Sequence, residues 1–99
     1  MKKGFVYILA NKTNNVLYVG VTSDIVKRIY EHKNHLVEGF SDRYNVTKLV
    51  YVEVLSTIEQ AIEREKRIKS WSRKRKEQLI NELNPNYEDM YDDIVKTYY

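Results

Sequence analysis

The chain of 99 residues contains no cysteine, one proline and three glycines. Without cysteine it has no disulfide framework, no thiolate nucleophile and no cysteine-ligated zinc. Any bound metal must therefore be held by carboxylates, histidine, backbone or water. Ligands of this kind favour a hard cation, and we expect Mg²⁺ or Mn²⁺.

Long apolar runs are also missing. No stretch approaches the roughly 20 apolar residues that a membrane span needs, and the basic start leads into only a short apolar stretch without a cleavage pattern. We therefore expect a soluble, cytoplasmic protein. The length fits one compact domain, and a hydrophobic fraction of 42% argues against disorder.

Charge is distributed unevenly along the chain. Residues 1–83 hold sixteen Lys and Arg against ten Asp and Glu, whereas residues 84–99 hold one against four. We expect residues 1–83 to form the domain. Residues 84–99 are expected to be an acidic, tyrosine-rich tail that is either part of the domain, as a short helix laid over its body, or partly flexible. Basic residues concentrated near 64–76 are typical of a phosphate-binding surface, although a solvated helix face fits equally well. They are Arg64, Lys66, Arg67, Lys69, Arg73, Lys74, Arg75 and Lys76.

The hydrophobic pattern predicts an α+β domain with the element order β-β-α-β-α-α. Three strands are expected, over residues 4–10, 16–21 and 48–55, the first two as a hairpin. In the third strand, Val50 and Val52 should face one side, and Leu49 and Tyr51 the other.

Three helices are expected, over about residues 24–35, 57–70 and 72–83, because each begins at a good N-cap residue, Asp24, Thr57 or Ser72. The segment 37–47 shows no clear period. We interpret it as a loop that brings Phe40, Arg43 and Tyr44 either to a site or merely across the surface.

Polar side chains fall where the helical pattern calls for apolar ones. Glu65 lies in the centre of the stripe formed by Ile58, Ala61, Ile62 and Ile68. A buried unpaired carboxylate costs several kcal/mol, so we expect a cation, a metal or strong donors beside it.

The first helix repeats this anomaly. His32 falls on the face defined by Ile25, Ile29 and Leu36, and Arg28 lies at its edge. Each polar residue alone has an ordinary structural explanation, as an ion pair or a satisfied core histidine. Together, on two helices that cover one small sheet, they predict a functional cluster.

Tyrosine outnumbers phenylalanine by nine to two. Tyr7 and Tyr18 should lie at corresponding places in the two hairpin strands, where cross-strand packing is the default explanation. A ring with a hydroxyl group also suits a site that exchanges protons with phosphate and water.

At this point the residues resemble a known family. Phe5-Val6-Tyr7, followed by Tyr18-Val19-Gly20, is similar to the paired motifs of the GIY-YIG nucleases, with phenylalanine in place of the first glycine and valines in place of the isoleucines. Residues 21–32 resemble the family's arginine-bearing helix, and residues 61–69 resemble the helix with its metal-binding glutamate. The likeness is greatest to short, stand-alone bacterial members, and it implies a small three-stranded antiparallel sheet flanked by helices.

The resemblance also implies a role for each matched residue. Tyr7 and Tyr18 would form the floor of the site, one of them assisting deprotonation of the attacking water. Arg28 would hold the scissile phosphate, and His32 would support proton transfer or orient a tyrosine. Glu65 would bind a single divalent cation, Mg²⁺ or Mn²⁺.

One family position has no match here. Many members carry an asparagine on the helix after the glutamate, and this role is left unassigned, with Asn81 and Asn84 as the nearest candidates.

We therefore expect a metal-dependent endonuclease that hydrolyses nucleic-acid phosphodiesters, in DNA rather than RNA. One alternative is a non-catalytic nucleic-acid-binding module with a vestigial site. A protein-interaction adaptor that uses the tyrosine-rich tail is the third hypothesis. The sequence does not define the preferred substrate structure or the oligomeric state. Because the chain is so small, a protein partner could supply its specificity.

Overall fold

The computed structural model describes residues 2–99; Met1, which belongs to the expected domain of residues 1–83, lies outside the described residues. The strands are β1 (Gly4–Ala10), β2 (Leu17–Thr22) and β3 (Lys48–Leu55). The helices are α1 (Ile25–Lys33), α2 (Phe40–Arg43), α3 (Ile58–Lys69), α4 (Arg73–Leu83) and α5 (Tyr91–Tyr98). The strands pair antiparallel in the order β2-β1-β3, which confirms the expected fold class.

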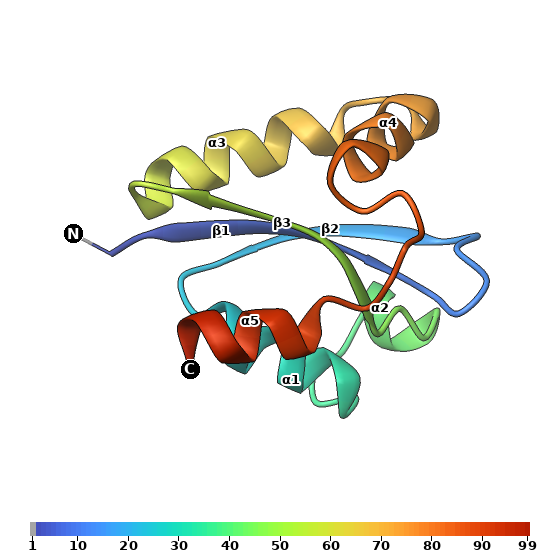
Figure 1. Cartoon of the computed structure of the whole chain (residues 1–99), viewed down its shortest axis with the longest axis horizontal. Helices are drawn as coiled ribbons and strands as arrows, with labels where there is room; N and C mark the ends of the chain where they lie inside the picture. Colours follow the sequence, from blue (N-terminus) through green and yellow to red (C-terminus); the bar gives the residue numbers. More distant parts are fainter. Residues whose placement is uncertain (1) are drawn as a thin grey trace.

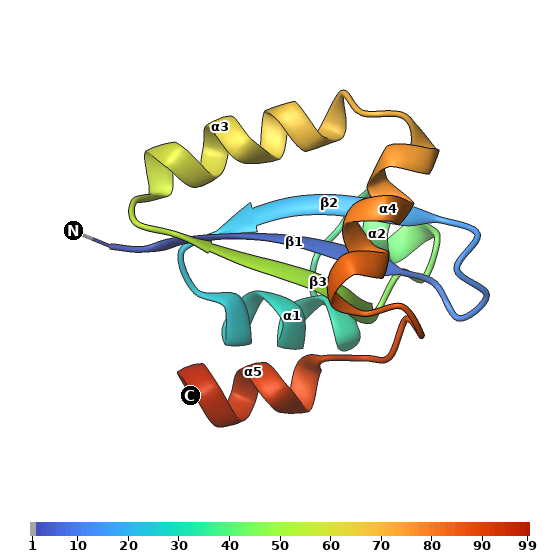
Figure 2. The same ribbon diagram turned by 45° about the horizontal axis from the view of Figure 1, so that its top comes forward.

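The sheet lies between two layers of helices (Figure 1). Helices α3 and α4 cover one face, and α1 and α5 cover the other, as the turned view also shows (Figure 2). All seven residues of β1 are buried because it is the central strand and has helices on both faces. Alternate residues of β1 enter the two cores: Phe5, Tyr7 and Leu9 pack on the α1 side, and Val6, Ile8 and Ala10 pack on the α3 side.

Side-chain caps begin the three helices that the sequence predicts. The Asp24 carboxylate accepts from the Lys27 N–H, the Thr57 hydroxyl from the Gln60 N–H, and the Ser72 hydroxyl from the Arg75 N–H. Each cap satisfies one of the free N–H groups of a first turn. The predicted N-termini are therefore confirmed.

Helix α1 is shorter than expected at its C-terminal end. It ends at Lys33, where the Asn34 side chain donates to the Tyr30 carbonyl and His35 adopts a left-handed conformation (φ 56°). Leu36 therefore lies outside the helix and is 64% exposed. The expectation that it extends the buried face is wrong.

Strand β3 contains a β-bulge that breaks its alternation. Leu49 lies opposite Leu9 and Tyr51 lies opposite Ile8, so Val50 is the extra residue. Leu49 packs in the core on the α1 side, while Val50 and Tyr51 both pack on the α3 side. The sides of the sheet that Leu49 and Val50 were expected to face, relative to Tyr51 and Val52, are therefore wrong.

Helix α2 adds to the predicted order, and α5 is the short helix that was one of the two alternatives for the tail. Helix α2 forms within the predicted loop, and α5 lies along α1 with Ile94 buried between them and the sheet. The Met90 N–H donates to the Leu49 carbonyl (2.8 Å), and Lys33 pairs with Asp89, so the segment before α5 is tied to β3 and α1. Across residues 2–99, none of the helices combines the length and apolar character that a membrane span requires.

Candidate active site

Tyr7 projects from the centre of β1 onto the α1 side of the sheet. Its partner in the antiparallel register is Gly20, not Tyr18, which lies opposite Leu9. The expectation that the two tyrosines occupy corresponding places is therefore wrong: they are diagonal neighbours, with ring centroids 6.3 Å apart. Ala10 at the end of β1 pairs with Leu17 at the start of β2, and this register puts Gly20 opposite Tyr7.

A chain of hydrogen bonds joins three buried side chains from three elements. Tyr7 Oη lies 3.0 Å from His32 Nε2, and His32 Nδ1 lies 2.9 Å from Ser41 Oγ. Tyr7, His32 and Ser41 are each less than 5% exposed. Both hydroxyl groups can donate or accept, so the chain can carry a proton in either direction.

Burial keeps the two titrating members of this chain neutral at pH 7. Burial, followed by the charge of Arg28, lowers the pKa of His32 from 6.5 to about 4. Burial, followed by the charge of Tyr18, raises the pKa of Tyr7 far above its usual value of 10.0. At neutral pH, therefore, Tyr7 holds its proton and His32 has one nitrogen free to accept one.

Tyr18, like Tyr7, packs its ring against His32. Its ring centroid is 5.5 Å from that of His32 and 6.1 Å from that of Phe40, with which it is stacked at an interplanar angle of 21°. The His32 ring is thus packed against both tyrosines. The contact with Phe40 comes from α2, which lies on the same side of the sheet as α1.

Arg28 provides the positive charge of the site. Its guanidinium lies 3.7 Å from the Glu31 carboxylate, and its side chain is 40% exposed. It lines a hollow of about 260 Å³ with residues from the end of β2 and the start of α1. Its charge opposes the rise that burial causes in the pKa of Tyr7 and adds to the fall that burial causes in the pKa of His32. Arg28 thus acts on both members of the buried pair while remaining open to a ligand.

Glu65 comes from α3, the helix on the other face of the sheet. Its side chain is only 12% exposed, and Oε2 lies 3.2 Å from Lys69 Nζ. After burial and the charges of Tyr18 and Arg28, the charge of the Glu65 carboxylate also affects the pKa of Tyr7, in the upward direction. The helical period indicates this inward orientation.

The residues around Glu65 fit one kind of metal site. Among residues 2–99 no group of three or more His, Cys, Asp and Glu side chains is placed to hold a metal ion. A site built on one carboxylate suits Mg²⁺ or Mn²⁺, because Mg²⁺ usually keeps several waters and takes further ligands from substrate phosphates. Glu65 could hold such a cation if Lys69 moved aside.

Several of the predicted phosphate-binding residues have structural partners. Arg64 donates twice to Glu53 (2.9 and 3.2 Å), and the Arg75 guanidinium lies 3.9 Å from the centroid of the Trp71 ring. Arg73 pairs with Glu77 and also donates to carbonyls of the β1–β2 turn, and Lys69 pairs with Glu65. Others are exposed and form no ion pair within residues 2–99: Lys66, Arg67 and Lys74. Lys76 is half-buried.

Asn84 is used by the fold. Its amide N donates to the carbonyls of Val50 (3.1 Å) and Glu88 (2.7 Å), and its amide O accepts from the Glu88 N–H. It therefore connects α4, β3 and the segment that leads to α5. Asn81 is exposed on α4.

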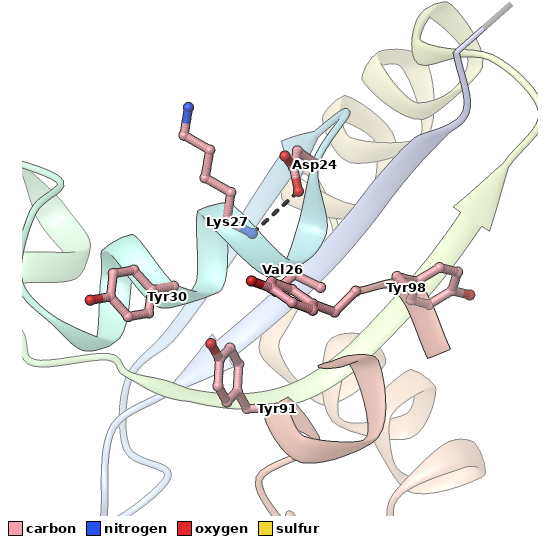
Figure 3. Close-up of a pocket in the computed structure, with 7 residues that line it drawn as sticks. Asp24, Val26, Lys27, Tyr30, Tyr91 and Tyr98 are labelled. Atoms are coloured by element: carbon pink, nitrogen blue, oxygen red, sulfur yellow. Dashed lines mark hydrogen bonds between the residues drawn. The ribbon is translucent and has the colours of Figure 1, made fainter. Parts of the chain in front are cut away.

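A larger hollow adjoins the one that Arg28 lines. It has a volume of about 470 Å³ and lies between α1 and α5, with Tyr30, Tyr91 and Tyr98 around it (Figure 3). None of Tyr7, Tyr18, Arg28, His32 and Glu65 lines it. It shares Asp24 and Lys27 with the hollow beside Arg28.

Ser41 is a member of the site that sequence reasoning missed. It lies in the segment without a hydrophobic period. The residue at the N-cap of α2 is Gly39, which has no side chain to signal the start of a helix. Only the buried hydrogen bond to His32 reveals it. A pattern analysis of the segment could not have found this contact, because it depends on tertiary packing.

A family model described as the GIY-YIG catalytic domain matches residues 3–81 of the chain. The chain belongs to the GIY-YIG family, a family of nucleases, and the predicted resemblance is confirmed. Its curated relatives include UPF0213 proteins. One from Staphylococcus saprophyticus is 38% identical over 82 residues, which cover 83% of this chain and 99% of the relative.

Two further relatives extend this comparison. A UPF0213 protein of Syntrophus aciditrophicus is 36% identical over 86 residues, covering 86% of this chain and 97% of its own length. The solution NMR structure of a UPF0213 protein from Bacillus halodurans is similar with a TM-score of 0.54 and 29% identity, covering 89% of this chain and 93% of that chain. The chain therefore spans nearly the full length of these short proteins.

Proposed function

We propose that this chain is a divalent-metal-dependent endonuclease that hydrolyses phosphodiester bonds in DNA. The observation that supports it best is the buried Tyr7–His32 hydrogen bond, with the charges of Arg28 and Glu65 both acting on the Tyr7 hydroxyl. Phosphodiester hydrolysis needs a base for the water, neutralisation of the phosphate and stabilisation of the leaving oxygen. The cluster offers a group for each task.

Proton transfer would pass through both members of the buried pair. Tyr7 is protonated at neutral pH, so its oxygen can take a proton from the attacking water only as its own proton leaves. His32 Nε2, 3.0 Å away, receives that proton while Nδ1–H donates to Ser41 Oγ. Tyr7 is thus the relay and His32 the final acceptor, with Tyr18 closing the floor beside them.

Charge stabilisation would come from the two sides of the sheet. Arg28, on α1, neutralises the oxygens of the scissile phosphate. Glu65, on α3, would hold the divalent cation. When bound, Mg²⁺ or Mn²⁺ supplies Lewis-acid stabilisation of the leaving oxygen.

The exposed basic residues of α3 and α4 would bind phosphates of the substrate beyond the one that is cleaved. Lys66, Arg67 and Lys74 are free to contact phosphates, whereas Arg64 is held by Glu53. Contacts of this kind strengthen binding without reading sequence.

The test compares the wild type with Glu65→Gln and the matched variant Glu63→Gln, which removes an exposed carboxylate from the same helix. Each is incubated with end-labelled duplex, single-stranded, flap and junction DNAs and with RNA, with and without Mn²⁺. We expect metal-dependent cleavage of DNA by the wild type and Glu63→Gln, and none by Glu65→Gln. Failure of the wild type to cut any substrate, or equal cleavage by Glu65→Gln, contradicts the proposal.

The Glu65–Lys69 ion pair is the observation that favours a non-catalytic module, because it already gives the carboxylate a partner. That function predicts binding that depends steeply on salt but not on divalent ions or on Glu65.

A further inference from the structure

An aromatic ladder leads out of the candidate site over α2. Phe40 stacks on Tyr18, and Tyr44 packs against Phe40 with ring centroids 4.6 Å apart. Phe40 is 48% exposed and Tyr44 is 45% exposed. Two large rings next to a reaction centre therefore keep nearly half of their surfaces open to solvent.

A positive charge accompanies the outer end of the ladder. The Arg43 guanidinium lies 5.9 Å from the centroid of the Tyr44 ring. Arg43 forms no ion pair with any residue between 2 and 99, whereas its neighbour Asp42 is paired with His35. The ladder thus offers flat apolar faces and one available cation, side by side.

We propose that Phe40 and Tyr44, with Arg43, form a base-stacking subsite for a nucleotide next to the scissile phosphate. A nucleobase presents a flat apolar face, and the phosphate attached to it presents a negative charge, so both parts of a nucleotide find a complementary group. The subsite is sequence-tolerant, because every base can stack. It accepts only a base that is not stacked within a duplex. The inference rests on the proposed function for the position of the phosphate.

Continuity with Tyr18 supports this occupant over an apolar peptide. The ladder begins at Tyr18, whose ring packs against those of Tyr7 and His32, so a ligand on Phe40 lies next to this buried pair. A strand whose phosphate lies at the pair formed by Tyr7 and His32 is thereby brought to the ladder by its own backbone.

The test measures binding in EDTA, where no cleavage occurs, so it is independent of the nuclease assay. Two probes of equal length and charge are compared: a short oligothymidylate, and a strand of abasic residues. We expect the wild type to bind oligothymidylate roughly tenfold more tightly than the abasic strand, the usual effect of stacking one base. Phe40→Leu should lose this preference by weakening only oligothymidylate binding, and Phe40→Trp should keep it.

Controls separate stacking from folding and from charge. Tyr30→Ala removes a similarly exposed tyrosine from α1 and should change neither affinity. Arg43→Gln should weaken both probes alike and reduce the salt dependence. Equal binding of the two probes by the wild type, no binding of either, or an equal loss for both in Phe40→Leu, overturns the subsite. A preference for bases in a protein that cuts nothing would instead overturn only the proposed function.

Discussion

The ring of Tyr7 lies against the backbone of Gly20 so closely that a Cβ at that position would be 2.3 Å from Tyr7 Cζ and 2.4 Å from Oη. A Cβ atom essentially never makes a non-bonded contact this short, so the ring would have to move. Because Tyr7 is packed and hydrogen-bonded to His32, it cannot move without a cost.

Gly20→Ala should therefore destabilise the protein by about 1–3 kcal/mol, the usual cost of overpacking a core. Urea unfolding would measure the loss. Tyr7→Leu removes the clashing atoms, so the double variant should be less destabilised than the sum of the two single variants. Strict additivity would mean that the ring does not meet the new methyl group.

Stability should fall in mild acid because His32 is held neutral. The folded protein binds the proton on His32 only near pH 4, whereas the unfolded chain binds it near pH 6.5. The unfolded state is thus favoured as the pH falls from 6.5 to 4, and the loss approaches about 3 kcal/mol below that range. Unfolding free energies of the wild type and His32→Gln, measured by urea titration at several pH values, would check this.

Carboxylates also titrate in acid, so the difference between the two proteins is the relevant quantity. Its full value should be present above pH 6.5 and should shrink toward pH 4. Parallel pH profiles would show that His32 does not contribute.

Ser41 should determine which nitrogen of His32 carries the proton. Ser41→Ala removes the partner of Nδ1, leaving Tyr7 alone to select a tautomer. We expect a single tautomer in the wild type, a mixture in Ser41→Ala, and a loss of about 1 kcal/mol in stability. Ring ¹⁵N chemical shifts report the tautomer directly. Ser41→Thr, which keeps the hydroxyl, is the control, and unchanged shifts in Ser41→Ala would disprove the effect.

Asn84→Ala should affect stability rather than chemistry. It removes three hydrogen bonds, to the Val50 and Glu88 carbonyls and from the Glu88 N–H, which should cost about 2 kcal/mol. The exposed Asn81→Ala should stay within about 0.5 kcal/mol. Thermal unfolding measures both. If folded Asn84→Ala shows a weakened response to Mn²⁺, the family's asparagine role belongs to this residue after all.

The sequence was sufficient to predict those features that depend on interactions between residues close together in the chain. The caps at Asp24, Thr57 and Ser72 begin helices because a nearby side chain satisfies the first turn, and that requirement is visible in a few residues. The helical period likewise pointed His32 inward, and it is buried.

Tertiary effects account for what the sequence did not show. The bulge that displaces Val50 arises from pairing with β1, and the offset of Tyr7 from Tyr18 arises from the hairpin register. Helix α2 is one turn long and is held by contacts such as that of Phe40 with Tyr18, which no hydrophobic period encodes. Ser41 was missed for the same reason.

The residues of the two motifs by which a GIY-YIG protein is recognised reflect packing more than chemistry. In Phe5-Val6-Tyr7 and Tyr18-Val19-Gly20, the side chains of Phe5, Val6 and Val19 fill cores, and Gly20 makes room for a ring. Natural selection for a folded sheet alone would preserve these four positions. A relative without nuclease activity would still carry most of both motifs, so the presence of the motifs follows the scaffold rather than an activity.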